Sequence, residues 1–347
     1  MSHLLLAAAL VLGIAGPGFA QNHRAEFQHI RMQEQTDPRG AFDAMQALAR
    51  AGYPAALARV GYYFRHGIGT NANLEQARTW YTRSVAAGHP WSAAALARVE
   101  MALDRGDRAF RLLQTAVRQN RPGAERLLAT AHVDRKLGAA SDPATGQLML
   151  ERLAASGDIR AAYDLAARSN WGRLNGPVPD TALAQVVRAG LEGDARFAEV
   201  ALVYLSRHGD KSAATLATRA RLANIPGMRP TVRSVERIRL AAEAEPAKFW
   251  TRVEEIMAET EVDGYARAAR TAFWINKNAW VRVLQKDLRR LGYYDGTVNG
   301  LMTARTIRAQ NRFCRDTGIG DICSAGPLRG PTVRAVAEAI AQRGRSR

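Results

Sequence analysis

The chain has 347 residues, of which 47% are hydrophobic and 7% are aromatic. Its 49 basic residues outnumber its 32 acidic ones, giving a formal net charge of +17, and only five of the basic residues are lysines. This composition favours an all-helical protein, and no segment after residue 20 is apolar enough to cross a membrane, which excludes an internal membrane span.

Residues 1–20 have the pattern of a cleaved signal peptide. An apolar run over Leu4–Ile14 follows a short polar start, and small residues stand at Gly18 and Ala20, just before the predicted cleavage site preceding Gln21. A retained membrane anchor is the alternative, but it requires an apolar core of roughly 20 residues. No cysteine lies near enough to suggest a lipid anchor. The sequence therefore predicts a periplasmic or secreted protein, which argues against nucleic acid as the partner of so basic a chain.

Residues 21–225 contain an internal repeat marked by a glycine or asparagine that recurs after 36, 32, 37 and 36 residues. The marks are Gly52, Gly88, Asn120, Gly157 and Gly193. Four positions after each mark stands a residue that is small in four of the five units: Ala56, Ser92, Ala124, Ala161 and Phe197. Eight positions after each mark stands an apolar residue: Val60, Leu96, Leu128, Leu165 and Ala201. Such a period predicts one helix-turn-helix per unit, with the small residue where two helices approach closely.

The first unit carries motif residues specific enough to name a family. They are Ala56, Val60-Gly61, Tyr63, Gly67-Ile68-Gly69, Ala77, Trp80-Tyr81 and Gly88. At this spacing they resemble the Sel-one-like repeat, a relative of the tetratricopeptide repeat. The resemblance implies an α-solenoid of stacked helix pairs that binds a protein partner. Four aromatic side chains of the unit either pack between helices, which we favour, or stack against a ligand: Tyr62, Tyr63, Trp80 and Tyr81.

Residues 226–279 are predicted to form a helical cap or connector. Pro226, Gly227 and Pro230 mark a break after the repeats. The stretch from Pro230 to Asn278 keeps the apolar periodicity of helices but loses the repeat register.

Residues 280–347 contain the most specific motif of the chain. Trp280–Leu291 predicts a helix with one apolar face, which ends at Gly292. Asp295-Gly296 and Asn299-Gly300 are dipeptides that tolerate positive φ, so they predict two turns before a second helix begins at Thr303. The segment therefore predicts a small helical bundle.

This segment resembles the peptidoglycan-binding domain of bacterial cell-wall proteins, through Leu284-Gln285, the Gly292–Gly300 turns, Thr306 and Phe313. It departs from the family pattern at Asn299, at Thr303-Ala304 and at Cys314. The resemblance implies five contacts to the sugar or peptide of the wall: Tyr293, Tyr294, Asp295, Asn299 and Arg305. The two tyrosines are equally plausible as core residues and Asp295 as a turn residue. A structural or protein-binding bundle without sugar affinity is the alternative for the whole domain.

Cys314 and Cys323 are the only cysteines, nine positions apart, and we expect them to form a disulfide in an oxidising compartment. Closing a ring of this size contributes up to roughly 2.5 to 3 kcal/mol. The same segment, residues 280–347, has 13 basic and 5 acidic residues. Its net charge of +8 predicts an anionic partner, either peptidoglycan, another anionic glycan or an acidic protein surface.

The sequence contains no recognisable catalytic motif, and we predict neither catalytic residues, nor a metal site, nor a cofactor. The histidines are scattered over different repeats. We therefore predict an exported, non-enzymatic envelope adaptor whose solenoid binds an unidentified envelope protein and whose C-terminal domain binds peptidoglycan. One alternative is a periplasmic regulator of a sensor or of a polysaccharide-export machine, with a protein-binding C-terminal domain. The other is an undetected cell-wall hydrolase.

Overall fold

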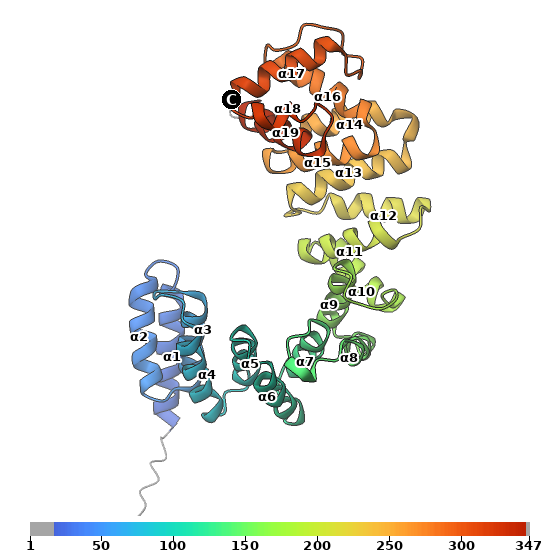
Figure 1. The fold of residues 1–347 in the computed structure, drawn as a ribbon. Helices are drawn as coiled ribbons and strands as arrows, with labels where there is room; N and C mark the ends of the chain where they lie inside the picture. The colour runs from blue at the N-terminus through green and yellow to red at the C-terminus, as the bar shows by residue number, and fades with distance from the viewer. Residues whose placement is uncertain (1–16, 345–347) are drawn as a thin grey trace, which may run out of the picture. The chain divides into compact units, whose positions relative to one another are not determined.

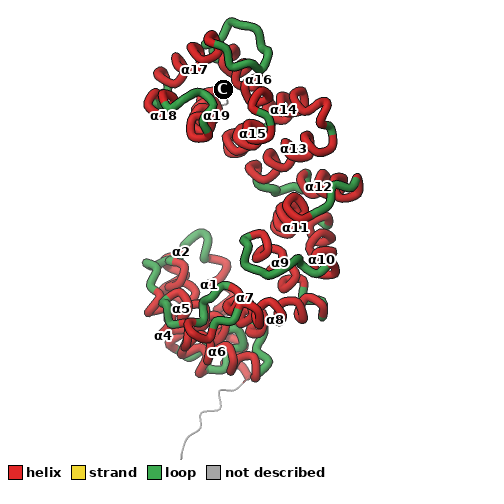
Figure 2. The backbone as a smooth tube through the Cα atoms, turned by 45° about the vertical axis from the view of Figure 1, so that its right-hand side comes forward, coloured by secondary structure: helices red, strands yellow, loops and turns green. Residues whose placement is uncertain are grey.

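The computed structural model describes residues 17–344, in which the all-α fold predicted from the sequence is confirmed (Figure 1). Figure 2 shows only helices and loops along this part of the chain. The predicted signal peptide lies outside the described residues, apart from 17–20, which begin the first helix. Among residues 17–344, no helix combines the length and the apolar character needed to cross a membrane.

The chain divides into two compact units, Met1–Leu150 and Glu151–Arg347. The first unit contains α1 (Pro17–Gln33), α2 (Pro38–Arg50), α3 (Pro54–His66), α4 (Leu74–Ala86), α5 (Ser92–Ala102), α6 (Gly106–Arg118), α7 (Ala124–Val133), the short 3-10 helix η1 (Gly138–Ala140) and most of α8 (Pro143–Ala155). The second unit continues with α9 (Ile159–Asn170), α10 (Asp180–Leu191), α11 (Ala195–His208), α12 (Ala213–Ala223), α13 (Pro230–Ala244), η2 (Pro246–Lys248), α14 (Phe249–Glu259), α15 (Val262–Ile275), α16 (Lys277–Arg290), α17 (Ala304–Asp316), α18 (Gly320–Ser324) and α19 (Gly330–Gly344).

The five predicted repeats correspond to five successive pairs of helices, from α3 and α4 to α11 and α12. Each mark residue lies in the turn that precedes the first helix of its pair and adopts a left-handed conformation. The φ angles are 90° at Gly52, 77° at Gly88, 50° at Asn120, 95° at Gly157 and 111° at Gly193. Glycine and asparagine recur at this position because they enter the left-handed region at the lowest steric cost.

The two other repeated positions lie in the packed interior between helices, where Leu96 of α5, for example, shares a core cluster with Ala77 and Tyr81 of α4. The residues four positions after the marks are buried in four units, and those eight positions after are buried in all five. The exception is Phe197, which is half-buried and packs against the ring of Tyr163 at 5.0 Å between centroids. Small side chains at the first position allow the helices to approach closely.

The aromatic residues of the first repeat are packing residues. Tyr63, Trp80 and Tyr81 are buried, and a side-chain carbon at Gly61 would lie only 3.0 Å from the ring of Tyr81. Burial raises the pKa of the Tyr81 hydroxyl to about 12. Tyr62 is half-buried under the guanidinium of Arg59, which lies 4.5 Å from the ring centroid. The interpretation of these residues as packing residues therefore holds for the three buried rings.

The helices from α13 to α19 share one hydrophobic core. It contains Ile238, Phe249 and Tyr265 from the predicted connector as well as Trp280 and Phe313 from the predicted C-terminal domain. Within it α15 packs against α13, α16 and α19. The division predicted between residues 279 and 280 thus falls inside a continuous core, and the C-terminal helices depend on α13–α15 for part of their packing.

Candidate functional site

The loop between α16 and α17 is organised by the fully buried side chain of Gln285. Its oxygen accepts hydrogen bonds from the backbone N–H groups of Asn299 and Gly300, both at 2.9 Å. Its nitrogen donates to the carbonyl of Leu301 and to the hydroxyl of Thr306, both at 3.0 Å. One side chain therefore satisfies most polar groups that the buried part of this loop presents.

Two of the five predicted ligand contacts belong to the same internal network. The Tyr294 ring is buried, and its hydroxyl donates to the carbonyl of Thr297 at 2.8 Å. The side-chain oxygen of Asn299 accepts from the Leu301 N–H at 2.9 Å and from the Gln285 amide at 3.2 Å. These hydrogen bonds hold the loop in its conformation, although Asn299 itself is exposed.

Only one of the two predicted glycine turns uses positive φ. Gly300 has φ 76°, and a side-chain carbon there would lie 2.8 Å from the carbonyl oxygen of Asn278. Gly296 does not have positive φ. It is required for space instead, because a side-chain carbon would lie 2.7 Å from both the Tyr294 hydroxyl and Cδ of Arg305.

The other predicted contacts differ in accessibility. The Tyr293 ring packs edge-on against Phe313 at 5.3 Å, and its hydroxyl accepts a hydrogen bond from Arg343 at 3.0 Å. Asp295 and Arg305 are exposed, and Arg308 is exposed one turn further along α17. No hydrogen bond or ion pair within residues 17–344 engages these three side chains. We refer to Asp295, Arg305 and Arg308 as the loop surface.

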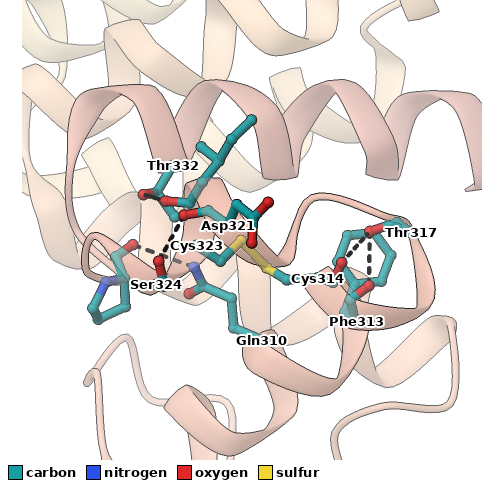
Figure 3. The surroundings of a disulfide bond; sticks show 10 residues. Gln310, Phe313, Cys314, Thr317, Asp321, Cys323, Ser324 and Thr332 are labelled. Atoms are coloured by element: carbon teal, nitrogen blue, oxygen red, sulfur yellow. Dashed lines mark hydrogen bonds between the residues drawn. A yellow bond between two sulfur atoms is a disulfide. The ribbon is translucent and has the colours of Figure 1, made fainter.

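Cys314 of α17 and Cys323 of α18 form a disulfide, as predicted (Figure 3). Both residues are buried in the C-terminal core. The carbonyl of Ile322 beside the bridge accepts a hydrogen bond from Thr332 at 3.1 Å, which ties α18 to α19. The disulfide therefore fixes a helix of only five residues, too short to be stable alone.

The first unit contains a groove of about 520 Å³ formed by the end of α4, by α5 and by α6. Val85, Leu96 and Leu112 contribute apolar side chains to it. Arg108 and Arg111 of α6 and Arg121 of the following turn contribute positive charge. The groove therefore combines an apolar lining with a basic wall. We refer to it as the α5–α6 groove.

Two arginines of the α5–α6 groove have no acidic partner among residues 17–344. Arg108 and Arg111 are exposed and form no ion pair within the described residues. Glu100 also lines the groove, is 5% exposed, and has one carboxylate oxygen without a hydrogen bond. Its nearest cation is Arg105 at 4.0 Å, and Arg105 forms a shorter ion pair of 2.6 Å with Glu75. The charged residues of the groove carry no signal in the sequence, because none of them belongs to the repeat motif.

Two carboxyl groups with perturbed pKa values, Glu34 and Glu236, form ion pairs between packed segments. Burial alone would raise the pKa of Glu34, but hydrogen bonds from Arg59 and Tyr63 hold this pKa below its ordinary value. Burial raises the pKa of Glu236 even though Arg219 donates to it at 2.5 Å. No cluster of three or more histidine, cysteine or acidic side chains suited to a metal ion lies within residues 17–344.

Comparisons with known proteins give structural neighbours alone. No family model matches the sequence, and no curated protein matches it. One solved structure with a similar fold is a protective antigen present in uropathogenic Escherichia coli strains, described as displaying an SLR fold, with 15% identity and a TM-score of 0.47 over 92% of this chain and 73% of that chain. Another is a Sel1 repeat protein from Oxalobacter formigenes, with 17% identity and a TM-score of 0.46 over 67% of this chain and 99% of that chain.

Both neighbours are Sel1-type repeat proteins. The evidence for repeated helix pairs in this chain is its own left-handed turns and the burial of its repeated positions. Neither Sel1-type neighbour is described as having a peptidoglycan-binding domain, so that part of the resemblance stays a prediction.

Proposed function

We propose that this chain is an exported, non-enzymatic adaptor of the cell envelope. In this proposal the helix-pair repeats bind a protein through the α5–α6 groove, and the loop surface binds peptidoglycan. The observation that supports the adaptor role most directly is the groove. It combines an apolar lining with Arg108 and Arg111, which form no ion pair within residues 17–344.

Export is supported by the signal-peptide pattern of residues 1–20 and by the disulfide between Cys314 and Cys323. Disulfides persist in oxidising compartments, and a periplasmic or secreted location provides one. The non-enzymatic part of the proposal is supported by the ion pairs and packing contacts that account for the perturbed pKa values of Glu34 and Glu236.

Peptidoglycan binding is supported by the resemblance of residues 280–347 to wall-binding domains and by their net charge. Arg305 and Arg308 are free to pair with the carboxylates of peptide stems, and guanidinium groups can bind carboxylates in a bidentate way. A regulator whose C-terminal domain contacts a protein is the second candidate. It is favoured by the burial of Tyr294, whose hydroxyl is engaged by Thr297, and by the engagement of the Asn299 side-chain oxygen within the loop, which leave fewer polar groups for a sugar.

The test is co-sedimentation of the oxidised full-length chain with purified sacculi over a salt series. Arg305→Glu combined with Arg308→Glu should reduce retention about tenfold or more at moderate salt. The matched control is Arg24→Glu with Arg160→Glu, because these arginines are exposed, lie outside both surfaces and give the same change in charge. Equal retention of the two double variants would reject the peptidoglycan site and favour the second candidate.

A further inference from the structure

We propose that the α5–α6 groove binds an acidic segment of a partner protein, in which carboxylates flank an apolar side chain. This inference rests on the proposed adaptor function and specifies the chemistry of its partner. It follows from the arginines of the groove, the buried carboxylate of Glu100, the apolar lining and a neighbouring exposed tryptophan.

The basic wall of the groove selects for negative charge. Arg108 and Arg111 are one helical turn apart on α6, so both can face a segment that lies along the groove. Arg121 lies in the turn after α6, where it donates to Gln119 at 3.3 Å. Because no ion pair within residues 17–344 engages Arg108 or Arg111, their full charge is available to carboxylates of a partner.

Glu100 limits where the negative charges of the partner can lie. Its carboxylate lines the groove and is 5% exposed, and its nearest cation, Arg105, lies 4.0 Å away. This carboxylate disfavours a ligand that places a phosphate or carboxylate directly beside it.

The apolar part of the groove indicates a protein segment and not a polyanionic sugar or nucleic acid. Val85, Leu96 and Leu112 would gain contacts from an apolar side chain. Trp91 is 56% exposed, and a side-chain carbon at Gly123 would lie 4.0 Å from its ring, so the ring lies beside the turn that carries Arg121. Tryptophan and arginine are the residues most enriched at the energetic centres of protein interfaces.

The charge of the chain argues against a second copy as the occupant. The chain carries a net charge of +17, so two copies carry a net repulsion that opposes their association. A separate partner with an acidic segment is attracted by the same charge, and its association should be fast and sensitive to salt.

The experiment is selection of a displayed library of random 12-residue peptides on the immobilised, oxidised full-length chain. We expect enrichment of peptides that have several Asp or Glu residues around an apolar residue. Because a basic protein attracts acidic peptides without a specific site, the decisive comparison is between two double variants. Arg108→Glu with Arg111→Glu reverses the charge of the groove, and Arg24→Glu with Arg160→Glu makes the same change elsewhere.

The groove variant should bind the enriched acidic peptides at least about tenfold more weakly and should instead enrich basic peptides, whereas the control variant should keep the original selection.

Thr115→Trp places an indole in the groove without changing the charge, and Thr115 is exposed, so the fold should tolerate it. This variant should also lose the acidic peptides. Enrichment of neutral or basic peptides by the native chain would overturn the proposal. So would equal loss of the acidic peptides in both double variants, or self-association that only the groove variant abolishes. Retention on sacculi would be unaffected by any of these outcomes, so the wall-binding part of the proposed function is tested separately.

Discussion

Gln285 is the residue on which the conformation of the α16–α17 loop depends most directly. Gln285→Leu leaves the backbone N–H groups of Asn299 and Gly300 without acceptors. We expect a loss of about 2–4 kcal/mol in the free energy of unfolding of the second unit, because each unsatisfied buried group costs about 1–3 kcal/mol. The measurement is urea denaturation. Arg160→Ala, at an exposed arginine of the second unit, should change stability by less than about 0.5 kcal/mol, and a similar effect of both variants would contradict this role of Gln285.

The predicted and observed roles within this loop differ for a physical reason. The motif containing Leu284-Gln285 predicted the end of α16 and the start of α17 to within one residue, but it placed the start of the first helix at Trp280 and not at Lys277. The sequence also does not specify which side chains of the loop point inward. That depends on the conformation at Gly296, where space and not positive φ requires glycine. Tyr294 is buried and contributes to the internal network, whereas Asn299 is exposed and contributes only its side-chain oxygen, and Asp295 and Arg305 are exposed without a hydrogen bond among residues 17–344.

His132 should make the stability of the first unit depend on pH. It is 6% exposed, and its Nδ1 accepts a hydrogen bond from the Asp142 N–H at 3.1 Å. Burial lowers its pKa below the ordinary value of 6.5. Below about pH 6.5 the unfolded chain therefore binds a proton that the folded chain does not, so stability falls as pH falls toward the folded pKa.

The comparison that isolates this effect is between the native chain and His132→Gln, which retains a side-chain acceptor but does not titrate. Melting temperatures measured between pH 7.5 and 5 should fall more steeply for the native chain. Parallel pH profiles would show that the protonation of His132 does not contribute.

The turns between helix pairs coincide with the recurring glycine or asparagine of the sequence, and all five of these residues have positive φ. Gly157 has φ 95°, and no atom lies within 4 Å of a side-chain carbon at this position. Gly157→Ala should therefore destabilise the chain by about 1–2 kcal/mol through backbone strain alone. Gly157→Asn should cost less, because asparagine already occupies the equivalent turn at Asn120 with φ 50°. Denaturation of the two variants tests this order, and a smaller cost for alanine would contradict it.

Other elements were less visible in the sequence. The α5–α6 groove has no motif of its own, since its residues come from the end of α4, from α5, from α6 and from turns, and none of its charged residues is a repeated position. Only the stacking of the helices brings Glu100 near Arg108 and Arg111. Periodicity predicts which face of a helix is buried, but it does not predict where neighbouring helices leave a concave space.

At the scale of the whole molecule, the sequence predicted the helix-pair repeats but not the extent of the C-terminal core. The motif of residues 280–347 suggests an independent domain, whereas the structure places Ile238, Phe249 and Tyr265 in the same core. A fragment of residues 280–347 should therefore be unfolded or aggregated, because it lacks the residues that cover α16 and α19. A fragment of residues 230–347 should fold. Amide hydrogen exchange on the two fragments is the measurement, and equal protection in both would contradict the shared core.

The adaptor proposal requires that the chain bind the wall and a protein at the same time. The most direct measurement is co-sedimentation of a selected acidic peptide with sacculi in the presence of the oxidised full-length chain. We predict that the peptide sediments with sacculi only when the chain is present. Sedimentation of the peptide should be lost with either of two double variants, Arg305→Glu with Arg308→Glu or Arg108→Glu with Arg111→Glu. Release of the chain from sacculi by the peptide would contradict the account, because both ligands would then compete for one basic surface.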